Sequence, residues 1–208
     1  MIISISGKKG SGKNTVASIF QLIKSEGYIE IKSSYNEPYN QSIERIIKSN
    51  LATPLLELSS GWEQKSFAYK IKQCVSLITG CTLKQLESQE FKQSMWNDIS
   101  YREFMQKLGT EVGRNIYENI WVDALLQEYT EDKNWLITDT RFPNEMETLR
   151  KYNTVFIKVI CEDCETVDTH VSETAIDHYK FKNIISAKKG DIKSLINQTQ
   201  ELINKLEL

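Results

Sequence analysis

Residues 1–15 have the sequence MIISISGKKGSGKNT, and this stretch decides the fold of the chain. Residues 1–6 form a short, mostly β-branched apolar run that is typical of a buried strand. Residues 7–15 have the glycine spacing and the terminal lysine of a phosphate-binding loop. A helix is predicted next, because apolar residues recur at helical spacing: Val16, Ile19, Phe20 and Ile23.

A strand, a glycine-rich turn and a helix together place several backbone N–H groups and a positive helix end around one point, which suits a polyphosphate. Lys13 would then reach the outer phosphates. Position 14 departs from the common pattern, because Asn14 stands where most such loops have a Ser or Thr hydroxyl on Mg²⁺, although Thr15 follows directly. The alternative is a solvated turn with exposed lysines.

The composition predicts one globular domain over residues 1–208. A formal net charge of −2 gives no basic field for nucleic-acid binding. No apolar run approaches the roughly 18 residues of a membrane span. The apolar run at residues 1–6 is too short for a secretory signal and is followed, not preceded, by lysines, so we expect a cytoplasmic protein.

Four cysteines fit a cytosolic protein. Cys161 and Cys164 form a single C-x-x-C at the end of a strand-like run. A structural zinc site usually needs two such pairs, so ordinary thiols are predicted, with a metal or redox role as the alternative.

Strands and helices alternate along the rest of the chain. Strands are predicted at 28–31, 134–139, 154–160 and 182–186, with a loop at 33–40. Helices are predicted at 65–80, 82–93, 120–129, 146–152 and 191–206. A further helix opens at a capping box, Ser100 with Glu103, and places Phe104, Leu108 and Val112 on one face. This order predicts an α/β fold, a parallel sheet covered by helices on both faces, with its site at the carboxyl ends of the strands.

Asp139-Thr140-Arg141 follows one of the predicted buried strands. An Asp at that place can hold Mg²⁺ directly or through water, and an Arg can bind a phosphate with two parallel hydrogen bonds. The alternative is an Asp that caps the next helix beside an exposed Arg.

With these residues in view, the chain resembles the bacteriophage deoxynucleoside monophosphate kinases of the P-loop kinase superfamily. Several ordered segments carry the resemblance: 7–15, 67–72, 102–111, 119–122, 138–145 and 170–175. Family members often have Asp at position 14, and residues 33–62 match the family poorly. The resemblance implies the P-loop kinase fold and transfer of the ATP γ-phosphoryl group to a deoxynucleoside 5′-monophosphate, giving a diphosphate.

The resemblance also implies roles for individual residues. The ATP phosphates would be held by Gly10, Ser11, Gly12 and Lys13, and Mg²⁺ would be oriented by Asn14 or Thr15, with Asp139 as a further ligand. The acceptor phosphate and the transferred charge would be gathered by Lys9, Lys72, Arg102 and Arg141. Four residues match the acceptor side or could touch a substrate there: Gln106, Gly109, Thr110 and Glu173. No general base is required, because the attacking group is already a phosphate oxygen.

Each assignment has an alternative. Lys72 could be a solvated helix lysine, Arg102 could pair with carboxylates on its own helix, and Gln106 could be an exposed helix residue. Glu173 could cap the following helix, and His170 is interpreted as a structural loop residue.

The expected partners of such a kinase are ATP and a deoxynucleoside monophosphate, and other functions fit the sequence less well. A nucleotide-dependent switch is disfavoured, because the only Asn-Lys, at 204–205, lies in the last predicted helix and lacks the Asp of Asn-Lys-x-Asp. A non-catalytic nucleotide-binding scaffold is disfavoured by the presence of Lys13, Asp139 and Arg141. A kinase for dephospho-coenzyme A or another small phosphorylated metabolite is the nearest alternative. The oligomeric state stays open, with a homodimer as one option.

Overall fold

The computed structural model describes residues 1–25, 43–44, 47, 60–164 and 171–208. The chain divides into two compact units. We call Met1–Lys65 with Glu131–Leu208 the sheet unit, and Ser66–Thr130 the helical unit. Each is described by itself, and the single domain expected over residues 1–208 stays a prediction.

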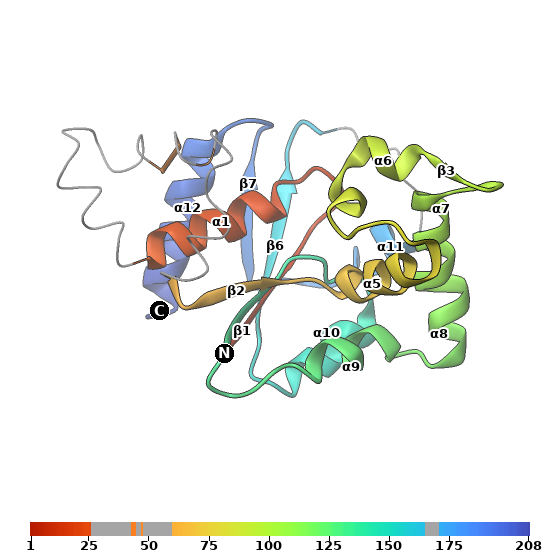
Figure 1. The fold of residues 1–208 in the computed structure, drawn as a ribbon. Helices are drawn as coiled ribbons and strands as arrows, with labels where there is room; N and C mark the ends of the chain where they lie inside the picture. Colours follow the sequence, from red (N-terminus) through yellow and green to blue (C-terminus); the bar gives the residue numbers. More distant parts are fainter. Residues whose placement is uncertain (26–42, 45–46, 48–59, 165–170) are drawn as a thin grey trace. The chain divides into compact units, whose positions relative to one another are not determined.

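The sheet unit is built on a five-stranded parallel sheet (Figure 1). Its strands are β1 (Ile2–Ser6), β2 (Trp62–Lys65), β5 (Asn134–Ile137), β6 (Val155–Cys161) and β7 (Asn183–Ala187). The order β2-β5-β1-β6-β7 places β1 in the centre, with β5 and β6 as its neighbours. The carboxyl ends of these three strands therefore meet at one edge of the sheet.

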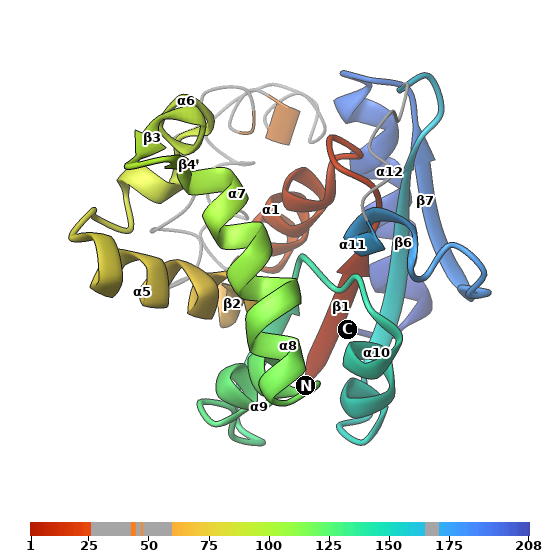
Figure 2. The same cartoon turned by 90° about the vertical axis from the view of Figure 1, so that its right-hand side faces the viewer.

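Helices cover both faces of this sheet, as Figure 2 shows. They are α1 (Lys13–Lys24), α10 (Pro143–Arg150), α11 (Val171–Thr174) and α12 (Ile192–Lys205). α1 and α12 lie together on one face, and α10 and α11 lie on the other (Figures 1 and 2). The predicted α/β class is confirmed.

Alternate side chains of β1, the central strand, are buried on opposite faces of the sheet. Ile3 and Ile5 belong to a buried cluster with Phe20 of α1 and Ile196 of α12. Ser4, on the opposite face, is fully buried and hydrogen-bonded. Burial on both faces is typical of a strand inside a parallel α/β sheet.

The helical unit contains five α-helices among the described residues: α5 (Phe67–Thr79), α6 (Gln89–Gln93), α7 (Tyr101–Gln106), α8 (Gly113–Ile116) and α9 (Ile120–Leu126). A 3₁₀ helix covers Gln85–Glu87, a π-helix covers Lys107–Val112, and a small hairpin joins β3 (Met95–Trp96) to β4 (Ile99–Ser100). Its buried core includes Val75, Cys81, Leu86 and Tyr101.

Two predictions were wrong in part, and one strand was missed. The helix predicted at 82–93 is divided into the 3₁₀ helix and α6, because the Ser88 side chain accepts a hydrogen bond from the Phe91 N–H and starts a new helix. The helix after Ser100 changes to π geometry at Lys107, which turns Val112 outward to 49% exposure. β2 was not predicted, although its Trp62 packs on Phe20 in the core.

The strand predicted at 28–31 and the loop at 33–40 lie outside the described residues. No helix within the described ranges has both the length and the apolar character to cross a bilayer.

Candidate active site

The phosphate loop joins the carboxyl end of β1, at Ser6, to the first residue of α1, Lys13. Three of its residues have positive φ angles: Gly7 at 152°, Gly10 at 79° and Gly12 at 94°. A Cβ atom at Gly7 would lie 2.3 Å from the carbonyl oxygen of Val159 on β6. The loop therefore crosses the neighbouring strand so closely that only glycine fits.

Backbone donors gather at the start of α1. The N-cap residue, Gly12, supplies no side-chain cap. The loop is closed by the Ser11 N–H, which donates to the Lys8 carbonyl at 3.1 Å. The N–H groups of Gly10, Asn14 and Thr15 form no hydrogen bond with any described residue. An uncapped helix start with open N–H groups is a ready anion site.

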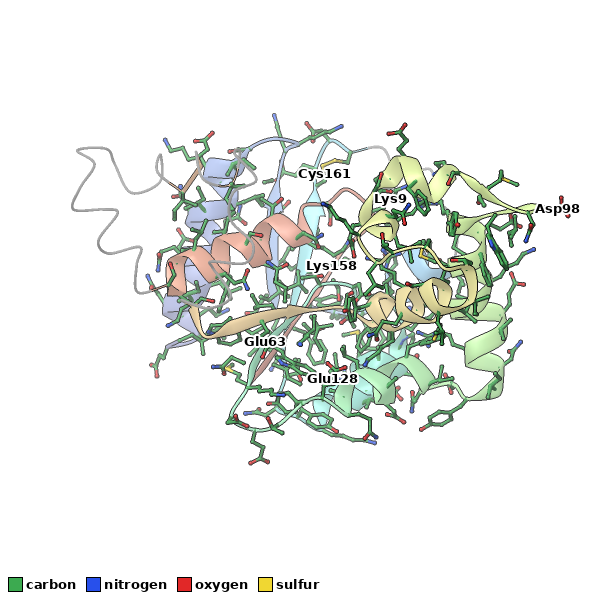
Figure 3. All side chains as sticks on the ribbon, in the orientation of Figure 1. Lys9, Glu63, Asp98, Glu128, Lys158 and Cys161 are labelled. Carbon is green, nitrogen blue, oxygen red and sulfur yellow. A yellow bond between two sulfur atoms is a disulfide. The ribbon has the colours of Figure 1, made fainter. Side chains whose placement is uncertain are left out.

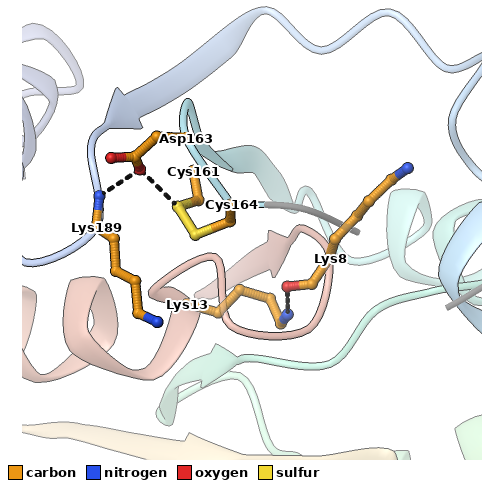
Figure 4. The surroundings of a disulfide bond; sticks show 6 residues. All are labelled: Lys8, Lys13, Cys161, Asp163, Cys164 and Lys189. Atoms are coloured by element: carbon orange, nitrogen blue, oxygen red, sulfur yellow. Dashed lines mark hydrogen bonds between the residues drawn. A yellow bond between two sulfur atoms is a disulfide. The ribbon is translucent and has the colours of Figure 1, made fainter. Parts of the chain in front are cut away.

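Lys13 is held inside this loop. Its ammonium donates to the carbonyl oxygen of Gly7 at 2.6 Å. It also donates to the carbonyl oxygen of Lys8 at 2.8 Å, as Figure 4 shows. The residue is only 9% exposed. The hydroxyl of Ser11 is buried without a hydrogen-bond partner in the described part of the chain. A lysine charge and an unsatisfied hydroxyl thus face the same small loop, as a phosphate site requires.

The Asp139-Thr140-Arg141 segment follows β5, the neighbour of β1. The Ser4 hydroxyl donates to the Thr140 hydroxyl oxygen at 2.8 Å, which joins the two strand ends. The Glu145 carboxylate accepts from the backbone N–H groups of Arg141 at 2.6 Å and Phe142 at 3.0 Å. These bonds place Asp139 and Arg141 at the same sheet edge as the phosphate loop, and Glu145 accepts hydrogen bonds at the start of α10.

Oxygen donors suited to Mg²⁺ lie at this edge. Asn14 is exposed and Thr15 is half-buried, both in the first turn of α1, and Asp139 is half-buried after β5. An amide, a hydroxyl and a carboxylate form the oxygen set that a hard cation prefers. Their chemistry therefore fits Mg²⁺.

Arg102 and Gln106 lie one turn apart on α7, hence on the same face. Both are half-buried, and neither side chain has a hydrogen bond or ion pair within the described ranges. Glu103 instead pairs with Lys107 at 3.1 Å, and that hydrogen bond raises the pKa of Lys107. The alternative in which Arg102 pairs with carboxylates on its own helix is not observed among the described residues.

Lys72 is not a solvated lysine. Its ammonium lies 2.6 Å from the Glu87 carboxylate, and its side chain is 14% exposed. An acceptor phosphate would therefore have to compete with Glu87 for this cation.

Gly109 and Thr110 lie in the π-helix of the helical unit. The Trp121 indole N–H donates to the Gly109 carbonyl at 2.8 Å, and the Thr110 hydroxyl donates to the Gln106 carbonyl at 2.6 Å. Both residues thus have a structural task in this helix. π-helical segments nevertheless occur frequently at functional sites.

Two further predicted residues are placed only in part. Lys9 is exposed on the phosphate loop (Figure 3). Glu173 belongs to α11, and its side chain is outside the description, as is all of His170.

One charged group near the loop was not predicted from the sequence. Asp177 lies 3.4 Å from the Lys8 ammonium and 3.7 Å from that of Lys158 on β6, which Figure 3 labels. These three residues are far apart in sequence, so no local pattern could have revealed them.

The prediction of ordinary thiols was wrong for one pair. Cys161 and Cys164 form a disulfide, with their Cα atoms 5.4 Å apart. Cys74 and Cys81 are free cysteines, as expected.

Comparison with known proteins points to one family. The model of the deoxynucleotide monophosphate kinase family matches residues 52–199, more than half of the chain. A deoxynucleotide monophosphate kinase of Escherichia phage RB69 is 25% identical over 62% of this chain and 56% of its own length. A deoxynucleoside-5′-monophosphate kinase of Escherichia phage T5 is 47% identical over 26% of this chain and 23% of its own.

A third relative extends the similarity along the sequence. A putative deoxynucleotide monophosphate kinase of Acanthamoeba polyphaga mimivirus is 23% identical over 95% of this chain and 93% of its own length. The matches to the two phage proteins cover less than two thirds of those proteins. The family match begins after the phosphate loop, so the geometry of that loop is an independent observation.

Proposed function

The chain belongs to the deoxynucleotide monophosphate kinase family, and we propose that it transfers the γ-phosphoryl group of ATP to a deoxynucleoside 5′-monophosphate. The observation that carries the proposal is the uncapped start of α1, where open backbone N–H groups and Lys13 face one small loop. Such a loop binds a polyphosphate whatever the acceptor is. Membership in this family indicates the class of acceptor, a deoxynucleoside monophosphate.

On the donor side, Gly10, Ser11 and Gly12 hold the ATP phosphates in this proposal. Lys13 exchanges its two loop carbonyls for phosphate oxygens and neutralises the charge that develops during transfer. The buried Ser11 hydroxyl gains a partner in the same event. In this proposal the Lys13 ammonium exchanges neutral carbonyl acceptors for anionic phosphate oxygens, which bind a cation more strongly.

The metal in this proposal is Mg²⁺ brought with ATP. Asn14 or Thr15 orients it from α1, and Asp139 holds it from the end of β5, directly or through water. When bound, the ion withdraws charge from the phosphate oxygens and fixes their geometry.

On the acceptor side, the cations are Lys9, Lys72, Arg102 and Arg141. Arg141 is presented by a backbone that Glu145 fixes, and Arg102 shares a helix face with Gln106. Guanidinium groups bind phosphate with two parallel hydrogen bonds, and the Gln106 amide can hydrogen-bond a base edge. Gly109, Thr110 and Glu173 are proposed to shape this side.

Phosphoryl transfer mainly requires the protein to align the donor with the acceptor and to place cations around the developing charge. We propose that residues 1–208 act as one catalytic domain for this reaction in the cytoplasm, that of the host if the protein is phage-encoded. Neither nucleic acid nor a membrane takes part in the proposal, and the protomer acts alone or as a homodimer.

A coupled assay of ADP release tests the proposed function. Purified protein is incubated with ATP, Mg²⁺ and each of the four common deoxynucleoside monophosphates, the matching ribonucleotides, and dephospho-coenzyme A. We expect turnover with at least one deoxynucleotide and a diphosphate product. Turnover with dephospho-coenzyme A alone would replace the proposal by its nearest alternative, and equal ADP release without any acceptor would indicate a simple NTPase.

A further inference from the structure

The Cys161–Cys164 disulfide has no task in the proposed phosphoryl transfer. It closes the turn at the carboxyl end of β6, and both cysteines are half-buried, so reagents in solution can reach them. Disulfides in cytosolic proteins are usually transient or redox-sensing. The pair is therefore a candidate for reversible chemistry.

Hydrogen bonds connect this turn to the segment that leads into α12. The Glu162 N–H donates to the Ala187 carbonyl at 3.1 Å, and the Lys189 N–H donates to the Asp163 carboxylate at 2.7 Å (Figure 4). The Ser186 hydroxyl donates to Glu162 at 2.9 Å. These bonds tie the turn to the residues that directly precede α12.

Strand β6, which precedes the turn, and helix α12, to which the turn is connected, both contact the phosphate loop. On one side, Val159 lies two residues before Cys161, and its carbonyl lies against Gly7. On the other, Leu195 of α12 lies 3.6 Å from the position of a Cβ at Gly12. Figure 4 shows Lys8 and Lys13 of the loop in the surroundings of the disulfide. The turn is therefore joined through packed elements to both ends of the loop.

We propose that Cys161 and Cys164 form a reversible dithiol–disulfide site that couples thiol redox state to the phosphate loop. A thiolate of a reducing dithiol attacks one sulfur, the S–S bond breaks, and a mixed disulfide forms with the other cysteine released. The second thiolate of the reductant then attacks the reductant's own sulfur in the mixed disulfide and displaces the cysteine that is still bound to it. The pair gains two electrons and two protons, and the reductant leaves as its own disulfide.

The direction of the coupling follows from the constraint. The disulfide limits the conformations of the turn, and so holds β6 and the start of α12 where Gly7 and Gly12 need them. Reduction removes the constraint, although Asp163, 3.5 Å from the Cys161 sulfur, can then accept a hydrogen bond from the thiol. The oxidised protein should bind ATP more tightly, by at least about fivefold, as is typical of coupled sites.

The affinity readout rests on the proposed function, so a second readout is included. The protein is equilibrated in buffers of reduced and oxidised dithiol, and the state of each cysteine is mapped by alkylation and mass spectrometry. ATP affinity is measured by calorimetry, and amide hydrogen exchange is followed at residues 7–12, in both states. Cys161→Ser with Cys164→Ser is compared with Cys74→Ser, which alters a free cysteine of the helical unit.

We expect the pair to interconvert reversibly, with slower loop exchange and tighter ATP binding in the oxidised form. The double serine variant should resemble the reduced protein in every buffer, and Cys74→Ser should respond like the wild type. If neither state binds ATP but loop exchange still changes, the proposed function fails and the redox site stands. Identical loop exchange in both states would overturn the inference. So would stoichiometric zinc held by Cys161, Cys164 and Asp163, whose ligand atoms lie within 4.8 Å of one another.

Discussion

Replacement of Lys13 should reduce turnover more than any other substitution in the phosphate loop. Its ammonium is enclosed by the loop carbonyls of Gly7 and Lys8 and would transfer to the phosphates during the reaction. Lys13→Ala should slow turnover by about 10²–10³, because one lost contact to developing charge typically costs about 2.7–4 kcal/mol. Steady-state rates measure this. Lys24→Ala, at the other end of α1, is the matched control, and a Lys13→Ala rate within about threefold of wild type would contradict a catalytic role.

Position 14 separates two ways of holding Mg²⁺. An amide oxygen is a weaker partner for a hard cation than a carboxylate. Asn14→Asp should therefore remain active and should shift the Mg²⁺ concentration for half-maximal rate. Asn14→Leu should lose most of its activity. Rates titrated against Mg²⁺ give the answer. If Asn14→Leu keeps its Mg²⁺ dependence while Thr15→Val loses it, the metal belongs to Thr15.

The two arginines should act on the acceptor more than on ATP. Arg141 follows β5, and Arg102 is half-buried on α7 without a partner among the described residues. Arg141→Ala and Arg102→Ala should each weaken binding of the monophosphate with little change for ATP. Calorimetric titration with each ligand measures both affinities, with Arg150→Ala, an exposed residue of α10, as control. Equal losses of affinity for both ligands would show that the arginines attract either ligand through their charge and have no specific role toward the acceptor.

At the scale of an element, the phosphate loop depends on how it crosses β6. Gly7→Ala would push a Cβ to 2.3 Å from a backbone carbonyl, which cannot move aside as a side chain can, whereas Gly10 has nothing within 4 Å of the same atom. Gly10→Ala should cost only the backbone strain, about 1–2 kcal/mol. Gly7→Ala should cost clearly more and should also displace the loop.

Urea unfolding and ATP affinity of the two alanine variants test this together. The expected order is wild type, then Gly10→Ala, then Gly7→Ala, in both stability and affinity. Equal stability of the two variants would show that the contact with β6 relaxes at no cost, and that the loop is less tightly fixed than its geometry indicates.

At the scale of the whole molecule, ATP should stabilise the folded chain. A ligand present at 100 times its Kd stabilises the state that binds it by about 2.7 kcal/mol. The urea midpoint of the wild type should rise accordingly when ATP and Mg²⁺ are added, and the rise should shrink for Lys13→Ala at the same ligand concentration. A urea midpoint that does not change when ATP is added would contradict ATP binding by the phosphate loop.

The sequence determined the class of fold and the phosphate loop, because both depend on short-range order. The strand of residues 2–6, the glycines after it and the apolar face of α1 are consecutive in the chain. Ser100 was correctly predicted as a helix cap, since it accepts the Glu103 N–H three residues away. The strands predicted at 134–139 and 154–160 are present as Asn134–Ile137 and Val155–Cys161, because their apolar runs are local signals of burial.

Only the tertiary structure decided which distant groups meet. The pairing of Ser4 with Thr140, the bridge from Lys8 through Asp177 to Lys158, and the ion pair of Lys72 with Glu87 each join residues well separated in sequence. The change to π geometry at Lys107 and the burial of Trp62 on Phe20 likewise depend on neighbours that periodicity does not identify. Local propensity acts over a few residues, whereas packing, ion pairs and a disulfide depend on distances that exist only once the chain has folded.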